Sequence, residues 1–180
     1  LEVLIAASKV TNCRVFQEHP EDLGQATKGI PASMYQLAET RRIVANYGYT
    51  RGAMYQCEVQ PNSRNRKPSG VITNSITLIA SPQFHSGWPR FAHGLALSGG
   101  CSERVYKGPL PKQCKCTSTH KPMIGKVGRT HATKGSETYS PGFCTWVARC
   151  AVHDWVSDNY PDLADKAILQ PGAQRTQHAT

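Results

Sequence analysis

The chain has 180 residues, enough for one compact domain but too few for two domains that each hold a sizeable interior. Leu, Ile, Val and Phe make up about 18% of the residues, so we expect a thin hydrophobic core in a loop-rich domain. A net charge of +9, with three Trp and seven Tyr to bury, argues against a wholly disordered chain.

The chain begins with a short apolar run, Val3 to Ala7. This run is far shorter than the about 18 residues that a membrane span requires, and it lacks the basic start and the length of a signal peptide. We therefore expect a soluble domain without a membrane span and, since the first residue is Leu1, a processed product or an excised fragment. Leu1 to Ala6 is also a weak candidate for a strand.

The first helix is predicted at about residues 34–47. Ser33 can cap it, Gln36 follows three residues later as in a capping box, and Gly48 offers a stop. The helical period is approximated by an apolar set that Arg41 interrupts, namely Leu37, Ala38, Val44 and Tyr47.

The strongest strand signal is the β-branched segment from Val71 to Ile79, and Met54 to Val59 is a weaker candidate. Strands and helices do not alternate regularly enough to predict a parallel doubly wound sheet. The expected class is therefore α+β.

Positive charge is concentrated in residues 102–136, which carry eight basic side chains and one acidic side chain. The segment is also rich in Gly, Pro, Ser and Thr, which predicts loops and short strands. Cations on such loops suit phosphate backbones, because they release counterions while small residues let the main chain approach. The expected contacts to an anionic polymer, either nucleic acid or polysaccharide, are Arg64, Arg66, Lys67, Arg104, Lys107, Lys112, Lys115, Lys121, Lys126, Arg129 and Lys134.

The chain has seven cysteines, many for a cytosolic domain, which indicates either an oxidising compartment or a metal. Disulfides would favour a secreted or extracytoplasmic location, and the odd number leaves at least one thiol unpaired within the chain. The basic stretch itself holds a competent tetrahedral zinc set of three thiols and an imidazole. These candidate ligands are Cys101, Cys114, Cys116 and His120, for which disulfides or unpaired thiols remain alternatives.

A second helix is predicted from Pro141 to just before Pro161. Ser140 can cap it, and proline is favoured at the first helical position. The predicted apolar band consists of Trp146, Val147, Cys150, Ala151 and Trp155. Cys150, His153 and Asp154 share one ridge of this helix, where side chains can meet. A short third helix is expected over Leu163 to Leu169.

The start of the second helix resembles a catalytic motif. Tyr139 to Arg149 contains Gly-Phe-Cys-Thr-Trp, which is similar to the nucleophile segment of cysteine, histidine-dependent amidohydrolase/peptidase domains in bacterial cell-wall hydrolases. The resemblance implies a Cys–His hydrolase with Cys144 as nucleophile, and the positive end of a helix lowers a thiol pKa. His153 lies nine residues on and falls on the opposite helix face. The required imidazole would come from His85, His93, His120 or His131.

The sequence thus predicts one α+β domain over residues 1–180, with a β-containing first part, a basic Cys-rich loop region and a helical C-terminus. The leading functional hypothesis is a binding module for an anionic polymer, most simply nucleic acid, with a possible zinc or disulfide staple. The alternatives are the Cys–His hydrolase and a secreted structural or interaction domain whose basicity serves only solubility.

Overall fold

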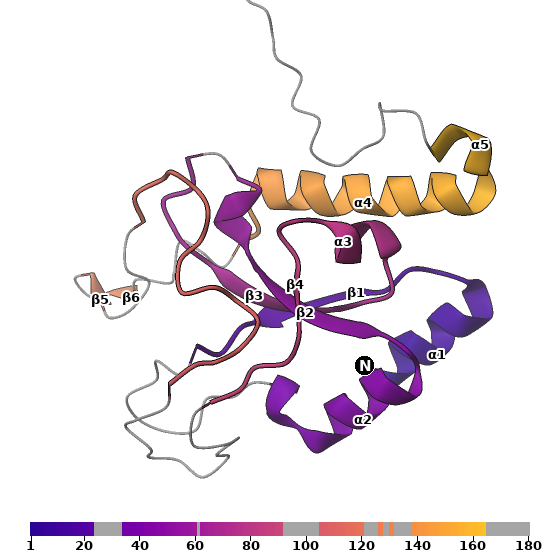
Figure 1. Cartoon of the computed structure of the whole chain (residues 1–180), viewed down its shortest axis with the longest axis horizontal. Helices are drawn as coiled ribbons and strands as arrows, with labels where there is room; N and C mark the ends of the chain where they lie inside the picture. The colour runs from indigo at the N-terminus through magenta and orange to yellow at the C-terminus, as the bar shows by residue number, and fades with distance from the viewer. Residues whose placement is uncertain are drawn as a thin grey trace, which may run out of the picture.

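A computed structural model of the chain describes residues 1–23, 34–60, 62–91, 105–120, 126–127, 130–131 and 138–164. Within these residues the fold is a four-stranded antiparallel sheet with helices on both faces (Figure 1). The α+β class predicted from the sequence is confirmed. No helix in these ranges is both long and apolar enough to cross a membrane.

The sheet has the strand order β1-β3-β2-β4. Its strands are β1 (Phe16–Pro20), β2 (Thr50–Tyr55), β3 (Pro68–Thr73) and β4 (His85–Ser86). The long central pair, β2 with β3, is in register from Thr50 opposite Thr73 to Tyr55 opposite Pro68. A separate two-stranded hairpin is formed by β5 (Lys126–Val127) and β6 (Thr130–His131).

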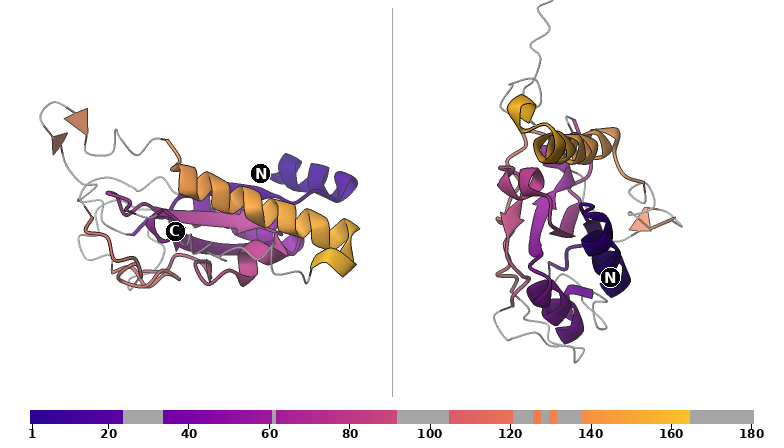
Figure 2. Two further views of the ribbon diagram at one scale, coloured as in Figure 1. Left: turned by 90° about the horizontal axis from the view of Figure 1, so that it is seen from above. Right: turned by 90° about the vertical axis from the view of Figure 1, so that its right-hand side faces the viewer.

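The helices divide between the two faces of the sheet, as the right-hand view of Figure 2 shows. One face carries α3 (Ile76–Ala80) and α4 (Pro141–Asn159), and α5 (Pro161–Ala164) follows α4. The other face carries α1 (Glu2–Thr11) and α2 (Ala38–Asn46), the latter preceded by the 3₁₀ turn η1 (Met34–Gln36). A second 3₁₀ turn, η2 (Gln56–Glu58), directly follows β2.

The two faces have separate cores because successive strand residues point in opposite directions. On β3, Val71 packs into the core beneath α4, whereas its neighbour Ile72 packs into the core with α1 and α2. The first core consists of Met54, Val71, Leu78, Phe84, Phe143, Trp146 and Cys150. The second consists of Ile5, Val15, Tyr35, Val44, Tyr49 and Ile72. The sheet is therefore the middle layer of three.

A third, smaller core places the candidate site. It consists of Ala53, Tyr55, Cys57 and Leu110, with Leu23, Tyr106, Cys114 and Cys116 packed against it. Residues 105–120 thus lie against the end of β2.

All three predicted strands are wrong in part or entirely. In place of the strand predicted from Leu1 to Ala6, the structure has helix α1, which begins at Glu2, buries Ile5 and Ser8 and leaves Val10 exposed. An apolar run this short fits a strand and a helix equally well, and packing against Val15 and Tyr49 decides for the helix.

The strand predicted over Val71 to Ile79 begins earlier, at Pro68, and ends at Thr73. Ser75 Oγ then accepts a hydrogen bond from Leu78 N at 3.1 Å and caps α3. A capping serine in the middle of a β-branched run therefore ends the strand. The weaker strand prediction, from Met54 to Val59, holds only to Tyr55, where η2 begins.

The predicted helices agree more closely with the structure than the predicted strands do. Ser140 Oγ accepts from Phe143 N at 3.3 Å, and α4 runs from Pro141 to Asn159 as expected. Residues 34–47 form η1 and α2 with a break at Leu37. The third helix begins at Pro161, and residues 165–169 of that prediction lie outside the described part of the chain.

Candidate metal centre and basic edge

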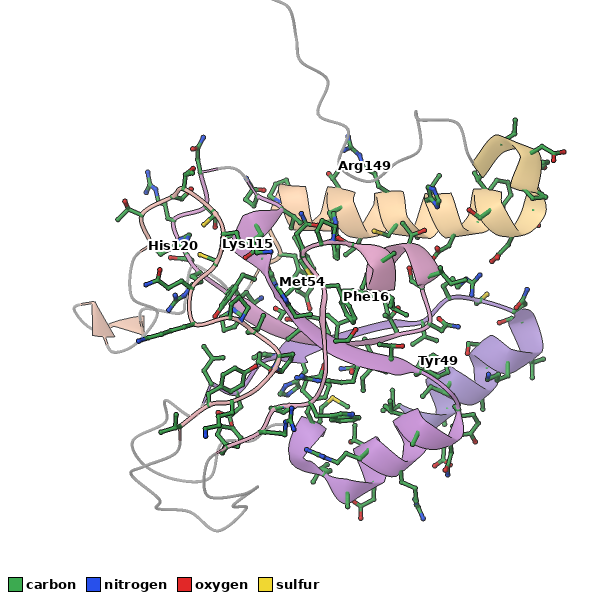
Figure 3. All side chains as sticks on the ribbon, viewed as in Figure 1. Phe16, Tyr49, Met54, Lys115, His120 and Arg149 are labelled. Atoms are coloured by element: carbon green, nitrogen blue, oxygen red, sulfur yellow. The ribbon has the colours of Figure 1, made fainter. Side chains whose placement is uncertain are left out.

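Three thiols and one imidazole meet at the end of β2. The ligand atoms of Cys57, Cys114, Cys116 and His120 all lie within 4.8 Å of one another. His120 Nε2 lies 3.3 Å from Cys114 Sγ and 2.8 Å from Cys116 Sγ, and the two sulfurs are 3.3 Å apart. Cys57 comes from η2, whereas the other three come from the segment 105–120, which carries the site in Figure 3.

Two hydrogen bonds hold this segment against β2 and η2. Tyr55 Oη donates to the carbonyl of Pro111 at 2.8 Å. Lys115 N donates to Glu58 Oε1 at 2.8 Å, and Glu58 is the last residue of η2. Cys57 lies between Tyr55 and Glu58 in the chain, so these contacts bring the cysteines of the segment to it.

Burial and the neighbouring thiols disfavour the thiolate form of two cysteines at this site. Burial raises the pKa of Cys57, and the neighbouring Cys114 raises it further. Burial also raises the pKa of Cys114, and the hydrogen bond with Cys116 raises it further. His120 Nδ1 is buried and has no hydrogen-bond partner among the described residues. Both pKa shifts disfavour the thiolate forms of Cys57 and Cys114 in the absence of a cation.

Three of the four residues predicted as zinc ligands lie close together. They are Cys114, Cys116 and His120, while Cys101 lies outside the described residues. Cys57 was not predicted, because it lies far from the others in sequence and its spacing carries no metal-binding signature. The six cysteines in the described ranges are all free of disulfides.

Two basic segments that are distant in sequence meet beside these cysteines. Arg66 Nη1 donates to the carbonyl of Lys112 at 3.5 Å, and the Arg66 guanidinium lies 5.5 Å from the centre of the Tyr55 ring. Lys67 Nζ lies 4.7 Å from the centre of the Tyr139 ring. We call the set formed by Arg64, Arg66, Lys67, Lys112 and Lys115 the basic edge.

The remaining predicted contacts are less well placed or not described. Lys107 is exposed on the same segment, and its N–H donates to the carbonyl of Arg90 at 2.7 Å. Lys126 is described by its backbone alone, in β5. The predicted contacts outside the described residues are Arg104, Lys121, Arg129 and Lys134.

Cys144 is exposed on the first turn of α4, where the predicted cap places it. No hydrogen bond within the described ranges joins its sulfur to an imidazole. His120 contacts Cys114 and Cys116, and His85 Nε2 is buried without a partner in the part of the chain that the structure describes. His93 lies outside the described residues, and His131 is described by its backbone alone.

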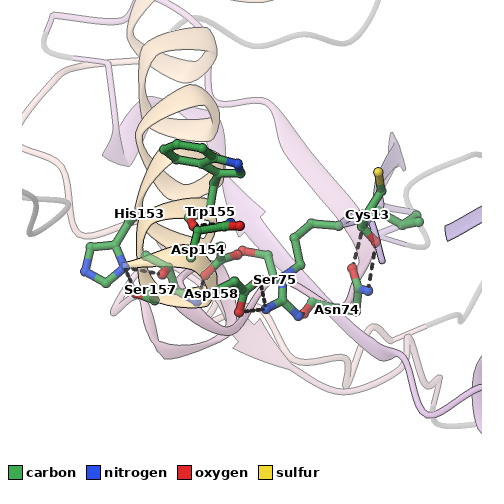
Figure 4. Close-up of polar contacts among 12 residues, drawn as sticks. Cys13, Asn74, Ser75, His153, Asp154, Trp155, Ser157 and Asp158 are labelled. Atoms are coloured by element: carbon green, nitrogen blue, oxygen red, sulfur yellow. Dashed lines mark hydrogen bonds and ion pairs between the residues drawn. The ribbon is translucent and has the colours of Figure 1, made fainter. Parts of the chain in front are cut away.

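Cys150, His153 and Asp154 fasten α3 to α4. Asp154 Oδ1 accepts from Thr77 N at 2.9 Å, and His153 Nδ1 lies 2.8 Å from Thr77 Oγ1. His153 Nδ1 also lies 3.4 Å from Ser157 Oγ on its own helix (Figure 4). Burial raises the pKa of Cys150 to about 12, with a further contribution from Asp154. This ridge has a structural role in joining the two helices.

Comparison with protein-family models, with curated proteins and with solved structures gave no match.

Proposed function

We propose that the chain is a binding module for an anionic polymer, most simply nucleic acid, and that the basic edge contacts its phosphates. The observation that carries this proposal is the contact of Arg66 with the Lys112 carbonyl. This contact brings together two basic segments that are distant in the sequence.

The charge around this contact favours a polyanion. Arg64, Lys112 and Lys115 are exposed, and the ion pairs of the described residues, Arg14–Asp158 and Arg51–Glu21, involve none of the basic edge. Glu58 is the acidic neighbour, and one of its oxygens is already engaged by Lys115 N. Cations without a protein counterion are available to displace counterions from a phosphate backbone.

The experiment measures affinity for a fluorescent single-stranded RNA, a DNA duplex and heparin against salt concentration. A variant with Arg64, Lys112 and Lys115 changed to Gln should bind more weakly. Its logarithmic salt slope should be smaller by about 2 to 3, since each lost phosphate contact contributes about 0.7 to 0.9.

A matched control separates a local site from total charge. Lys9, Arg42 and Arg149 are exposed on α1, α2 and α4, and changing them to Gln removes the same charge away from the basic edge. The control should keep the slope of the unchanged chain. Equal losses in both variants, preference for heparin over both nucleic acids, or no binding at low salt would each contradict the proposal.

A further inference from the structure

We propose that Cys57, Cys114, Cys116 and His120 bind one zinc ion, with Cys57 as the ligand that completes the site. The metal is structural, and it fastens the segment 105–120 to the end of β2. This inference stands on the geometry of the four residues and holds whether or not the chain binds a polyanion.

The donor types select zinc. Three thiolates and one imidazole are a common tetrahedral set for Zn²⁺, whereas Mg²⁺ and Ca²⁺ prefer oxygen donors. The four donors come from two separate parts of the chain, so one ion links them. Cys57 lies in the turn after β2, and the other three lie within seven residues of one another.

The spacing of the donors is close to that of a tetrahedral zinc site. Around tetrahedral zinc, with bonds of about 2.0 to 2.3 Å, neighbouring donors stand about 3.4 to 3.8 Å apart. The sulfurs of Cys114 and Cys116 are 3.3 Å apart, and His120 Nε2 lies 2.8 to 3.3 Å from them. Movements of less than about 1 Å in these three contacts give the zinc geometry.

The same distances argue against a disulfide between Cys114 and Cys116, because a bonded pair has its sulfurs about 2.0 Å apart. They also argue for a shared ligand, since three thiols gather in a small apolar core. Cys57 is only 3% exposed and packs with Ala53, Tyr55 and Leu110. A divalent cation neutralises thiolates that this surrounding would otherwise disfavour.

The surroundings assign a structural role. Four protein donors fill all four positions of a tetrahedral zinc ion, which leaves no position for a water or a substrate. The proposed zinc ion also lies where the segment 105–120 buries few apolar side chains, of which Leu110 is the main one. Zinc binding energies of order 10 kcal/mol can hold such a segment in place.

The test uses the whole chain, purified under reducing conditions. Metal analysis should find one zinc per chain. Replacement by Co²⁺ should give the intense visible bands of tetrahedral cobalt together with a thiolate charge-transfer band. Absence of bound metal after incubation with equimolar zinc would overturn the proposal.

Ligand identity is read by differential alkylation of the unmodified sequence, which avoids variants that fail to fold. With zinc bound, Cys57, Cys114 and Cys116 should resist alkylation, and a chelator should make all three reactive. Cys13 and Cys144 are exposed and should react equally in both states. Protection of Cys101 in place of Cys57 would show that Cys57 is not the fourth ligand.

Substitutions give the same answer quantitatively. Cys57→Ser should lower zinc affinity at least about 100-fold, because loss of a group that only hydrogen bonds to a metal ligand already costs about 10-fold to 100-fold. Cys57→His restores a donor and should recover part of the affinity. Cys101→Ser and Cys144→Ser should bind zinc as the unchanged chain does. Loss of binding in Cys101→Ser, or full affinity in Cys57→Ser, would refute the assignment.

Discussion

Arg51 and Glu21 form an ion pair in which both side chains are completely closed to solvent. Arg51 Nη2 donates to Glu21 Oε2, and Arg51 Nη1 donates to the carbonyl of Gly87 at 2.8 Å. Tyr106 Oη donates to the other Glu21 oxygen at 2.6 Å, and the Arg51 guanidinium lies 4.4 Å from the centre of the Tyr35 ring. The pair thus joins β2, the residue after β1 and the segment 105–120 in one buried network.

Removing one member of this pair should be costly. Burial raises the pKa of Glu21, and the positive charge of Arg51 opposes that shift, so the carboxylate depends on Arg51. Glu21→Ala should lower the free energy of unfolding by about 3 to 5 kcal/mol, because it leaves a buried guanidinium unpaired. Urea unfolding measures the loss. The double variant Glu21→Leu with Arg51→Met should lose less than Glu21→Ala, and a loss equal to the sum of the two single changes would contradict this account.

The hydrogen bond of Tyr139 predicts a pH effect. Tyr139 Oη donates to Glu18 Oε2 at 2.7 Å, which together with burial raises the pKa of Tyr139 from 10.0 to about 12. Between these values the unfolded chain loses the phenol proton and the folded chain keeps it. Stability should therefore fall as pH rises from about 10 to 12.

Tyr139→Phe removes this contribution. The unfolding free energy of the variant should fall less steeply over that range than that of the unchanged chain. Other tyrosines titrate there too, so the quantity to compare is the difference between the two proteins in urea unfolding. Equal pH slopes would show that the bond to Glu18 does not hold the proton.

Asp154 should act as a cap supplied from another helix. Its Oδ1 accepts from Thr77 N at the start of α3, and Asp154 is only 2% exposed. Asp154→Ala should cost about 1 to 2 kcal/mol of stability. Asp158→Ala is the control, because its pair with Arg14 is partly exposed and should contribute about 1 kcal/mol or less. Thermal unfolding compares the two, and a smaller loss at Asp154 would contradict the cap.

Removal of the metal should expose the segment that it holds. Lys112 and Lys115 flank Cys114, and both are exposed residues of the segment 105–120. We expect removal of the zinc by a chelator to speed tryptic cleavage after these lysines. A segment that is no longer held against β2 can enter the active site of the protease more readily. Mass spectrometry of timed digests gives the rates, with cleavage after Arg149 on α4 as the internal reference. Unchanged relative rates at these lysines would mean that the metal does not hold the segment.

Cys144 should behave as an ordinary exposed thiol. It is exposed on the first turn of α4, and no hydrogen bond within the described ranges joins its sulfur to an imidazole. Cys144→Ser should therefore leave the behaviour of the chain towards ester and peptidoglycan substrates unchanged, as hydrolysis assays of both proteins can measure. Hydrolysis of an ester or of peptidoglycan that Cys144→Ser abolishes would support the hydrolase alternative instead.

Local signals were enough to predict α4, because Ser140 and Pro141 act on the residues next to them. They failed at α1, where a short apolar run fits either structure until Ile5 meets its packing partners. The convergence of Cys114, Cys116 and His120 was predictable from close spacing. The arrival of Cys57 was not, since it depends on β2 ending beside the segment 105–120.

The two edge strands of the sheet also influence whether copies of the chain can associate by strand pairing. Strand β4 has two residues, too few to serve as a template for another chain. Strand β1, at the other edge, carries Glu18 and ends at Pro20, which has no N–H to offer. Short, charged and proline-ended edges discourage strand addition between molecules. The two sheet edges in the described part of the chain therefore disfavour edge-to-edge aggregation between copies of the protein.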